Sequence, residues 1–89
     1  MAEEYTVNLT DSIQAAVDGA SSGDVIIVAP GTYTENIVIS KDNMVIRSES
    51  GNPANTIIAA KNPNASVITI QGRNHVTVKG FQITGAGFN

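Results

Sequence analysis

The feature that most limits how this chain can fold is the stretch VIIVAPGTYTENIVI, residues 25–39. It holds two β-prone apolar runs, Val25 to Ala29 and Asn36 to Ile39, separated by a corner that contains Pro30 and Gly31. Proline fixes its own φ and glycine accepts a positive φ, so this pair suits a type II turn. The corner is too open for a two-residue hairpin, and no helical pattern lies between the runs. We therefore expect a chain that winds from strand to corner to strand and stacks successive coils.

Seven short segments after residue 24 have the composition of strands, and polar turns such as SESGNPAN and KNPNA separate them. Segment 66–71 alternates most clearly, which places Val67 on the face opposite Ile68 and Ile70. Such strands fit a β-helix, a small sandwich or a small barrel. The turns between them lack the Asn-Gly and Asp-Gly pairs of tight hairpins, which favours the β-helix. The segments are 25–29, 36–39, 44–47, 56–59, 66–71, 75–79 and 81–84.

A longer-range similarity points to the same architecture. NMVIRSES and NHVTVKGF both read as an Asn followed by a β run, and they begin at Asn43 and Asn74. Their separation of 31 residues exceeds a usual rung because two long loops intervene. We interpret them as the same edge of two coils, with the two Asn side chains in a ladder at a bend.

The region before these strands predicts a strand from Tyr5 to Leu9 and then a short helix. Asp11 is a good N-cap, and Gln14 stands in the capping-box position. Because so short a helix is marginal alone, its apolar stripe must sit on another element. We expect it to cap the first rung, since a β-helix exposes its apolar interior and unpaired backbone at each end. A helix on the side of a sheet in an α+β domain is the alternative. The stripe consists of Ile13, Ala16, Val17 and Ala20.

The order helix, then GDVIIVAPGTYTENIVISKDNMVIRSESGNPANTIIAA, resembles the amino-terminal part of right-handed parallel β-helix proteins of the pectin lyase-like superfamily. Its pattern is most similar to the pectin methylesterase-like, nitrous oxide reductase accessory and archaeal surface-protein members, from about Tyr5 to Phe88. The resemblance implies an all-β solenoid: a right-handed, single-stranded parallel β-helix with a short N-terminal capping α-helix, open or truncated at its C-terminus. We expect one domain, 1–89, with strand and cap in 5–24 and about two and a half rungs in 25–89.

Composition agrees with one small domain that has a stacked β-branched core. Hydrophobic residues make up 42% of the 89 residues and charged residues 15%. There is no Cys, so the chain offers neither a disulfide nor a thiolate site. No apolar run is long enough to span a membrane. We expect a fragment of a longer protein or a piece meant to stack.

Charge is split along the chain. The first 49 residues hold all eight acids and two bases, a net charge of −6, and residues 50–89 hold three bases and no acid, a net charge of +3. This asymmetry either supports end-to-end association or arises by chance on a weakly charged surface. Three scattered bases are no basic stripe, so we expect no nucleic acid partner.

The chain shows no catalytic constellation. Enzymes of the superfamily that the chain resembles use Gln, Asp and Arg residues or calcium-binding Asp residues in later rungs, and nothing here matches these. Glu35 and Asp24 suit structural acceptors of backbone donors at turns. His75 has no second His or Cys to form a metal site, so we expect a histidine at the surface or rung edge. We predict no catalytic, cofactor-binding or metal-binding residue.

We therefore predict a non-catalytic structural module of an extracellular or cell-surface protein that associates with itself through its open last rung. A dimer ranks slightly ahead of a filament. A polysaccharide is a second candidate partner. The sequons at Asn8 and Asn64 agree with export. The predicted self-association edge consists of Val76, Val78, Phe81, Ile83 and Phe88.

Two other functions remain open. The chain could be the scaffold fragment of a polysaccharide-active lyase or esterase whose active site lies in missing rungs, which carboxylates and an Arg in the next coils would reveal. It could also be a glycan-binding module, although aromatic residues, on which sugars stack, make up only 4% of the chain.

Overall fold

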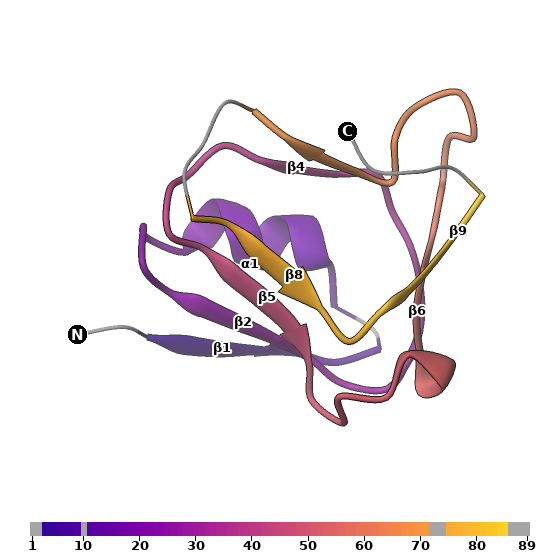
Figure 1. Cartoon of the computed structure of the whole chain (residues 1–89), viewed down its shortest axis with the longest axis horizontal. Helices are drawn as coiled ribbons and strands as arrows, with labels where there is room; N and C mark the ends of the chain where they lie inside the picture. The colour runs from indigo at the N-terminus through magenta and orange to yellow at the C-terminus, as the bar shows by residue number, and fades with distance from the viewer. Residues whose placement is uncertain (1–2, 10, 72–74, 86–89) are drawn as a thin grey trace.

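The computed structural model describes residues 3–9, 11–71 and 75–85. Within these ranges the chain forms strands, one α-helix and one 3₁₀ helix (Figure 1). In chain order they are β1 (Glu4–Val7), α1 (Ile13–Gly19), β2 (Val25–Val28), β3 (Gly31–Thr34), β4 (Ile37–Ile39), β5 (Val45–Ser48), η1 (Pro53–Asn55), β6 (Thr56–Ala59), β7 (Ile68–Ile70), β8 (Thr77–Lys79) and β9 (Gln82–Thr84).

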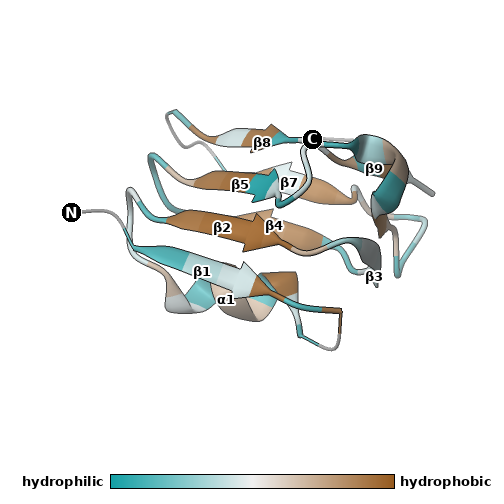
Figure 2. Ribbon diagram, turned by 90° about the horizontal axis from the view of Figure 1, so that it is seen from below, coloured by the Kyte–Doolittle hydropathy of each residue, from teal (hydrophilic) through white to brown (hydrophobic). Residues whose placement is uncertain are grey.

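Three parallel sheets surround one interior (Figure 1). Their strand orders are β1-β2-β5-β8, β3-β6-β9 and β4-β7. The chain visits the sheets in a fixed order, which we call a pass: β2, β3 and β4 form the first pass, β5, β6 and β7 the second, and β8 and β9 begin the third. Figure 2 shows the passes stacked in layers, with β8 and α1 at opposite ends of the stack. The prediction of a mostly β fold with parallel strands and one short helix is confirmed.

Register explains why the layers stack. Ile26 of β2 pairs with Ile46 of β5, and both side chains are buried, at 0% and 1% exposure. Ile37 of β4 pairs with Ile68 of β7 in the same way, and both are buried. Because a parallel ladder places identical faces of successive strands over one another, β-branched side chains form continuous columns in the interior. Each pass therefore covers the apolar surface of the pass before it.

The corner between 25–29 and 36–39 was predicted wrongly as a simple turn. Gly31–Thr34 forms strand β3, which pairs in parallel with Thr56–Ala59. The segment is strand because β6 supplies partners for its backbone and Tyr33 turns into the core, where it is only 3% exposed. The alternation of two Thr residues around Tyr33 was the signal for this strand.

The apolar stripe predicted for the helix is confirmed, whereas the predicted N-cap, Asp11, is wrong. Ile13, Val17 and Ala20 are buried in the core. The N-cap is Ser12, whose Oγ accepts a hydrogen bond from the Ala15 N–H (3.2 Å). The Asp11 carboxylate instead accepts from the Asn8 N–H (3.0 Å), so Asp11 closes the turn that leads into the helix.

One corner has a residue with positive φ in every pass. Gly23, Asn43 and His75 each stand two residues before a strand of the first sheet, and each has a positive φ, at 92°, 59° and 59°. The pairing of Val45 with Thr77 places His75 level with Asn43. The predicted Asn43–Asn74 equivalence is therefore off by one residue, and Asn74 itself lies outside the described residues. Asn is one of the few non-glycine residues that accept this conformation readily, which explains Asn43.

The strict alternation predicted for 66–71 is also wrong at one position. Val67 and Ile68 are both buried, at 0% and 1% exposure. The strand begins only at Ile68, and Val67 belongs to the bend before it, where side chains do not alternate.

Candidate functional site

The candidate site is the end of the stack formed by the outer edges of β7, β8 and β9. Each of these strands is the last of its sheet, and no described strand pairs with its outer edge. Four predicted edge residues lie here and pack partly buried against the core: Val76, Val78, Phe81 and Ile83. Phe88, the fifth, lies outside the described residues.

Two of these side chains continue buried columns that then stop. Val78 pairs with Ile46 and Ile83 pairs with Ile58, and both partners in the earlier pass are fully buried, at 1% and 0% exposure. Val78 and Ile83 are only partly buried because no described layer covers them. The end of the stack therefore combines apolar side chains with backbone groups that point outward, which is the composition of a strand-pairing surface.

The opposite end of the stack is covered by α1, which contacts β1, β2 and β4. Figure 2 shows the helix beside β1, away from β8. Its N-terminus is held by Glu35, which lies between β3 and β4. The Glu35 carboxylate accepts hydrogen bonds from the Ile13 N–H (2.8 Å), the Gln14 N–H (3.0 Å) and the Ser12 hydroxyl (3.0 Å).

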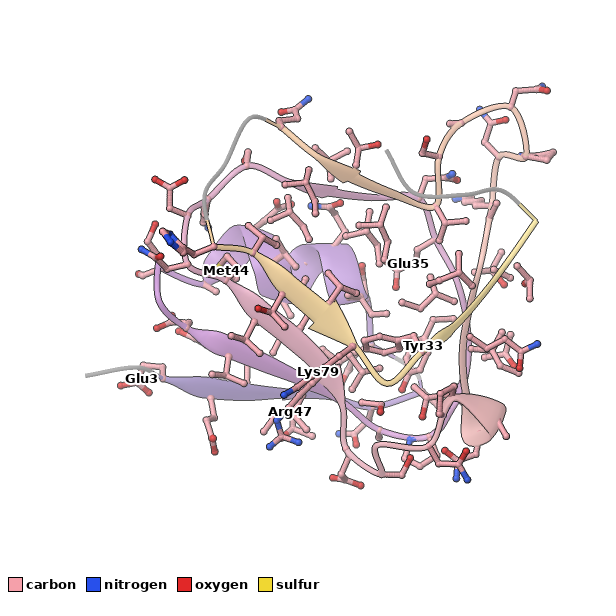
Figure 3. The ribbon with its side chains drawn as sticks, viewed as in Figure 1. Glu3, Tyr33, Glu35, Met44, Arg47 and Lys79 are labelled. Carbon is pink, nitrogen blue, oxygen red and sulfur yellow. The ribbon has the colours of Figure 1, made fainter. Side chains whose placement is uncertain are left out.

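Glu35 therefore accepts backbone donors, as predicted, but at a helix start more than 20 residues away rather than at its own corner. Figure 3 shows its side chain beside one end of α1. A carboxylate is favourable there because the free N–H groups and the helix dipole are both positive at an N-terminus. Sequence spacing gave no sign of this contact, because the two partners belong to different elements.

Asp24 is a buried acceptor at the junction of three segments. Its carboxylate accepts from the Ser21 N–H (2.8 Å) after α1 and from the Glu3 N–H (3.1 Å) at the start of β1. The backbone hydrogen bond from Ser21, followed by that from Glu3, lowers the pKa of Asp24 against the opposing effect of burial. The prediction of a structural turn residue is confirmed.

Tyr33 ties the first corner to the interior. Its hydroxyl donates to the Ala29 carbonyl (2.7 Å), and the Val7 carbonyl lies 3.4 Å away. Burial, together with the negative charges of Asp11, Glu35 and Glu49, raises the pKa of this phenol. Tyr33 is therefore a neutral hydrogen-bond donor that closes the end of β2.

Arg47 and Lys79 lie in register on the outer face of the first sheet (Figure 3). Both line a shallow surface hollow together with Glu49 and two serines, Ser48 and Ser50. The hollow mixes positive and negative groups and is open to solvent.

The other predicted positions are exposed. His75 and Asn8 are exposed at turns, and Thr10 of the first sequon lies outside the described residues. Asn64 of the second sequon is exposed in the loop between β6 and β7, and its N–H donates to the Asn62 side chain (3.0 Å). Within the described residues, no three His, Cys, Asp or Glu side chains gather in a way that could hold a metal ion. No helix in the described ranges is long and apolar enough to cross a membrane.

Asn36 is a structural residue that sequence analysis missed. Its Nδ2 donates to the Asn62, Ala65 and Ser66 carbonyls, and its Oδ1 accepts from the Asn62 N–H (2.6 Å). One side chain thus binds three residues of the loop between β6 and β7. An Asn at a bend between two strands was the available signal.

Comparison with known proteins finds a relative among cell-surface proteins. The chain is 41% identical over 75 residues, 82% of its length, to a protein of Methanothermus fervidus named "Cell surface glycoprotein". The match covers 12% of that protein, so the chain spans only a small part of the relative's length. No protein-family model matches the chain, and no solved structure matches it. The resemblance to the pectin lyase-like superfamily stays a prediction.

Proposed function

We propose that this chain forms the capped N-terminal rungs of a right-handed parallel β-helix and acts as a non-catalytic structural module of a cell-surface protein. The repeated order of parallel strands in the three sheets supports the β-helix. The similarity to a protein named as a cell surface glycoprotein supports the location.

The module associates with a second copy through the outer edges of β7, β8 and β9. The observation that carries this part is the pair of interrupted columns, in which Val78 and Ile83 lie over buried isoleucines and have no described layer above them. A strand from another copy would supply both the missing apolar cover and the backbone partners. Two copies related by a two-fold axis at these edges use the same surface on both sides and therefore form a closed dimer.

The test is the mass in solution over a concentration series, measured by light scattering coupled to size exclusion. We expect wild type to shift from one copy to two. In Ile83→Asp, an unpaired carboxylate would be buried in the dimer, so the dissociation constant should rise by about 100-fold, which corresponds to roughly 3 kcal/mol. The control is Gln82→Asp, which places the same charge on the exposed face of the same strand and should leave the dimer intact.

Circular dichroism and amide exchange in α1 show whether each variant keeps its fold. Equal dimerisation of folded Ile83→Asp and wild type would reject the edge as the contact. A wild type that stays monomeric up to about millimolar concentration would reject self-association itself.

A further inference from the structure

Strand β4 has an outer edge that a side chain occupies in place of a strand. The Ile37 N–H donates to the Val67 carbonyl (2.7 Å), and the Ile39 carbonyl accepts from the Gln71 N–H (3.0 Å), so these residues face β7. Backbone groups of successive strand residues point to opposite sides, and the N–H and C=O of Val38 therefore face away from β7. In an unprotected edge strand these two groups would be free to pair with another chain.

Gln14 of α1 satisfies both of these groups. Its Oε1 accepts from the Val38 N–H (2.7 Å), and its Nε2 donates to the Val38 carbonyl (3.1 Å). A primary amide has one acceptor and one donor side by side, the same pair that a neighbouring strand presents. The Gln14 side chain thus ends the β4-β7 sheet as a strand would, but offers no edge of its own.

The two residues that flank β4 hold the helix in the position that this contact requires. Glu35 binds the first turn of α1 through the three hydrogen bonds described above. Lys41 Nζ donates to the carbonyls of Val17 (2.9 Å), Asp18 (2.8 Å) and Ala20 at the other end. Anion at the N-terminus and cation at the C-terminus both match the helix dipole.

We propose that Gln14, Glu35 and Lys41 form a clamp that closes the outer edge of β4, at the α1 end, to strand pairing by a second copy of this chain. The strand excluded is β7 of that copy. β7 and β4 are the two edges of one parallel sheet, so a second molecule placed head to tail would continue the ladder from β7 to β4 in the same direction. Charge favours that arrangement, because Asp11 and Asp18 are exposed at the α1 end and Lys79 is exposed on β8 at the other end.

The clamp therefore prevents a head-to-tail contact that the charges of the two ends would favour. It leaves the edges of β7, β8 and β9 as the surface that accepts a partner, and this last point rests on the proposed function. With the clamp in place the ladder from β7 of one copy to β4 of the next cannot form, whereas without it this ladder allows head-to-tail growth beyond two copies.

The clamp is tested first at Val38. In Gln14→Met the side chain keeps its length and helix propensity but loses both hydrogen bonds, so exchange of the Val38 amide hydrogen should become about tenfold faster by NMR. The matched control is Asp18→Ala, which removes the other acceptor of the Gln14 Nε2 (2.9 Å) and should leave Val38 exchange at the wild-type rate. Unchanged Val38 exchange in Gln14→Met overturns the proposed seal.

The second test joins Glu35→Ala with Lys41→Met in the full chain. We expect amide exchange across residues 13–19 to rise by about 100-fold, since several charge-assisted hydrogen bonds are lost, and we expect particle mass to grow past two copies with concentration. Wild-type exchange in the helix, or a freed helix with no growth in mass, contradicts the clamp. A monomeric wild type would reject the proposed function. The clamp would still be tested in that case, by whether the particle mass of the double variant grows with concentration.

Discussion

Asp24 shows how one residue sets the start of the stack. It is 4% exposed, and its carboxylate joins the end of α1, the beginning of β1 and the start of β2. The sequence predicted its role in the local turn, because Asp commonly accepts from backbone groups of its own turn. It did not predict the bond from Glu3, which is 21 residues away and exists only because β1 pairs with β2.

Stability should depend on the ionisation of Asp24. Its pKa lies below the ordinary value of 3.8 in the folded protein, so its contribution is complete above that value and is lost as pH falls through the folded pKa. We expect wild type to lose unfolding free energy between about pH 5 and pH 2 more steeply than Asp24→Asn. Urea unfolding at a series of pH values measures this, and parallel pH profiles for the two proteins would contradict it.

At the scale of elements, the loop between β6 and β7 depends on a residue from the previous pass. Asn36 precedes β4 and binds four backbone groups of the loop. Polar loops without regular structure need such partners, because buried or half-buried backbone groups are costly when unpaired. The loop therefore has a defined path although its sequence, KNPNA, indicates only a turn.

Replacing Asn36 should release this loop and leave the sheets in place. We expect Asn36→Ala to lower the unfolding free energy by about 1–2 kcal/mol and to make residues 61–66 the first site of cleavage in limited proteolysis. Asn36→Asp keeps the acceptor for the Asn62 N–H but places an anionic oxygen against the three carbonyl oxygens that the Asn36 amide group now binds, so it should destabilise the loop at least as much as Asn36→Ala. Identical cleavage patterns in Asn36→Ala and wild type would show that the loop is held by other contacts.

The elements also show where sequence reasoning ends. The stripe of α1 was predictable because Ile13 and Val17 follow helical spacing, and β6 was predictable with its bounds, 56–59, because polar turns border it. The N-cap and β3 were not. Ser12 is the cap in place of Asp11, and its hydroxyl binds Glu35 of the first pass, while β3 exists because β6 pairs with it. For β3, a partner distant in sequence decided between two local possibilities.

At the scale of the whole molecule, the charge split of the sequence becomes only in part a charge difference between the two ends, because Lys41 binds the last turn of α1 and Lys61 lines a surface hollow with Asp11. Asp11 and Asp18 are exposed at the α1 end, and Lys79 is exposed on β8 at the other. The candidate association surface, by contrast, is defined by the strand order, because β7, β8 and β9 are the last strands of their sheets. Val78 and Ile83 were predictable as edge residues from the assumed order of coils, while the contacts that close the α1 end depend on side-chain geometry.

The charges at the two ends predict how the stability of the dimer depends on salt concentration. A dimer joined at the β8 ends brings like charges together, so raising ionic strength from about 0.02 M to 0.5 M should tighten it by roughly two- to fivefold. Head-to-tail contacts join opposite charges and would weaken over the same range. Sedimentation equilibrium at several salt concentrations measures whether salt strengthens or weakens the dimer. Lys79→Gln, which removes a like charge, should reduce the effect of salt on a dimer joined at the β8 ends. Weakening by salt in wild type would contradict that arrangement.

The corner formed by Gly23, Asn43 and His75 has a consequence for how such a chain gains or loses residues in evolution. All three residues have a positive φ although 20 residues separate the first two and 32 separate the last two. Loops elsewhere in each pass absorb the difference, while this corner stays constant. A gene duplication or deletion with both breakpoints at this corner would join matching backbone geometries, so whole layers can be gained or lost while the neighbouring strands keep their direction and register.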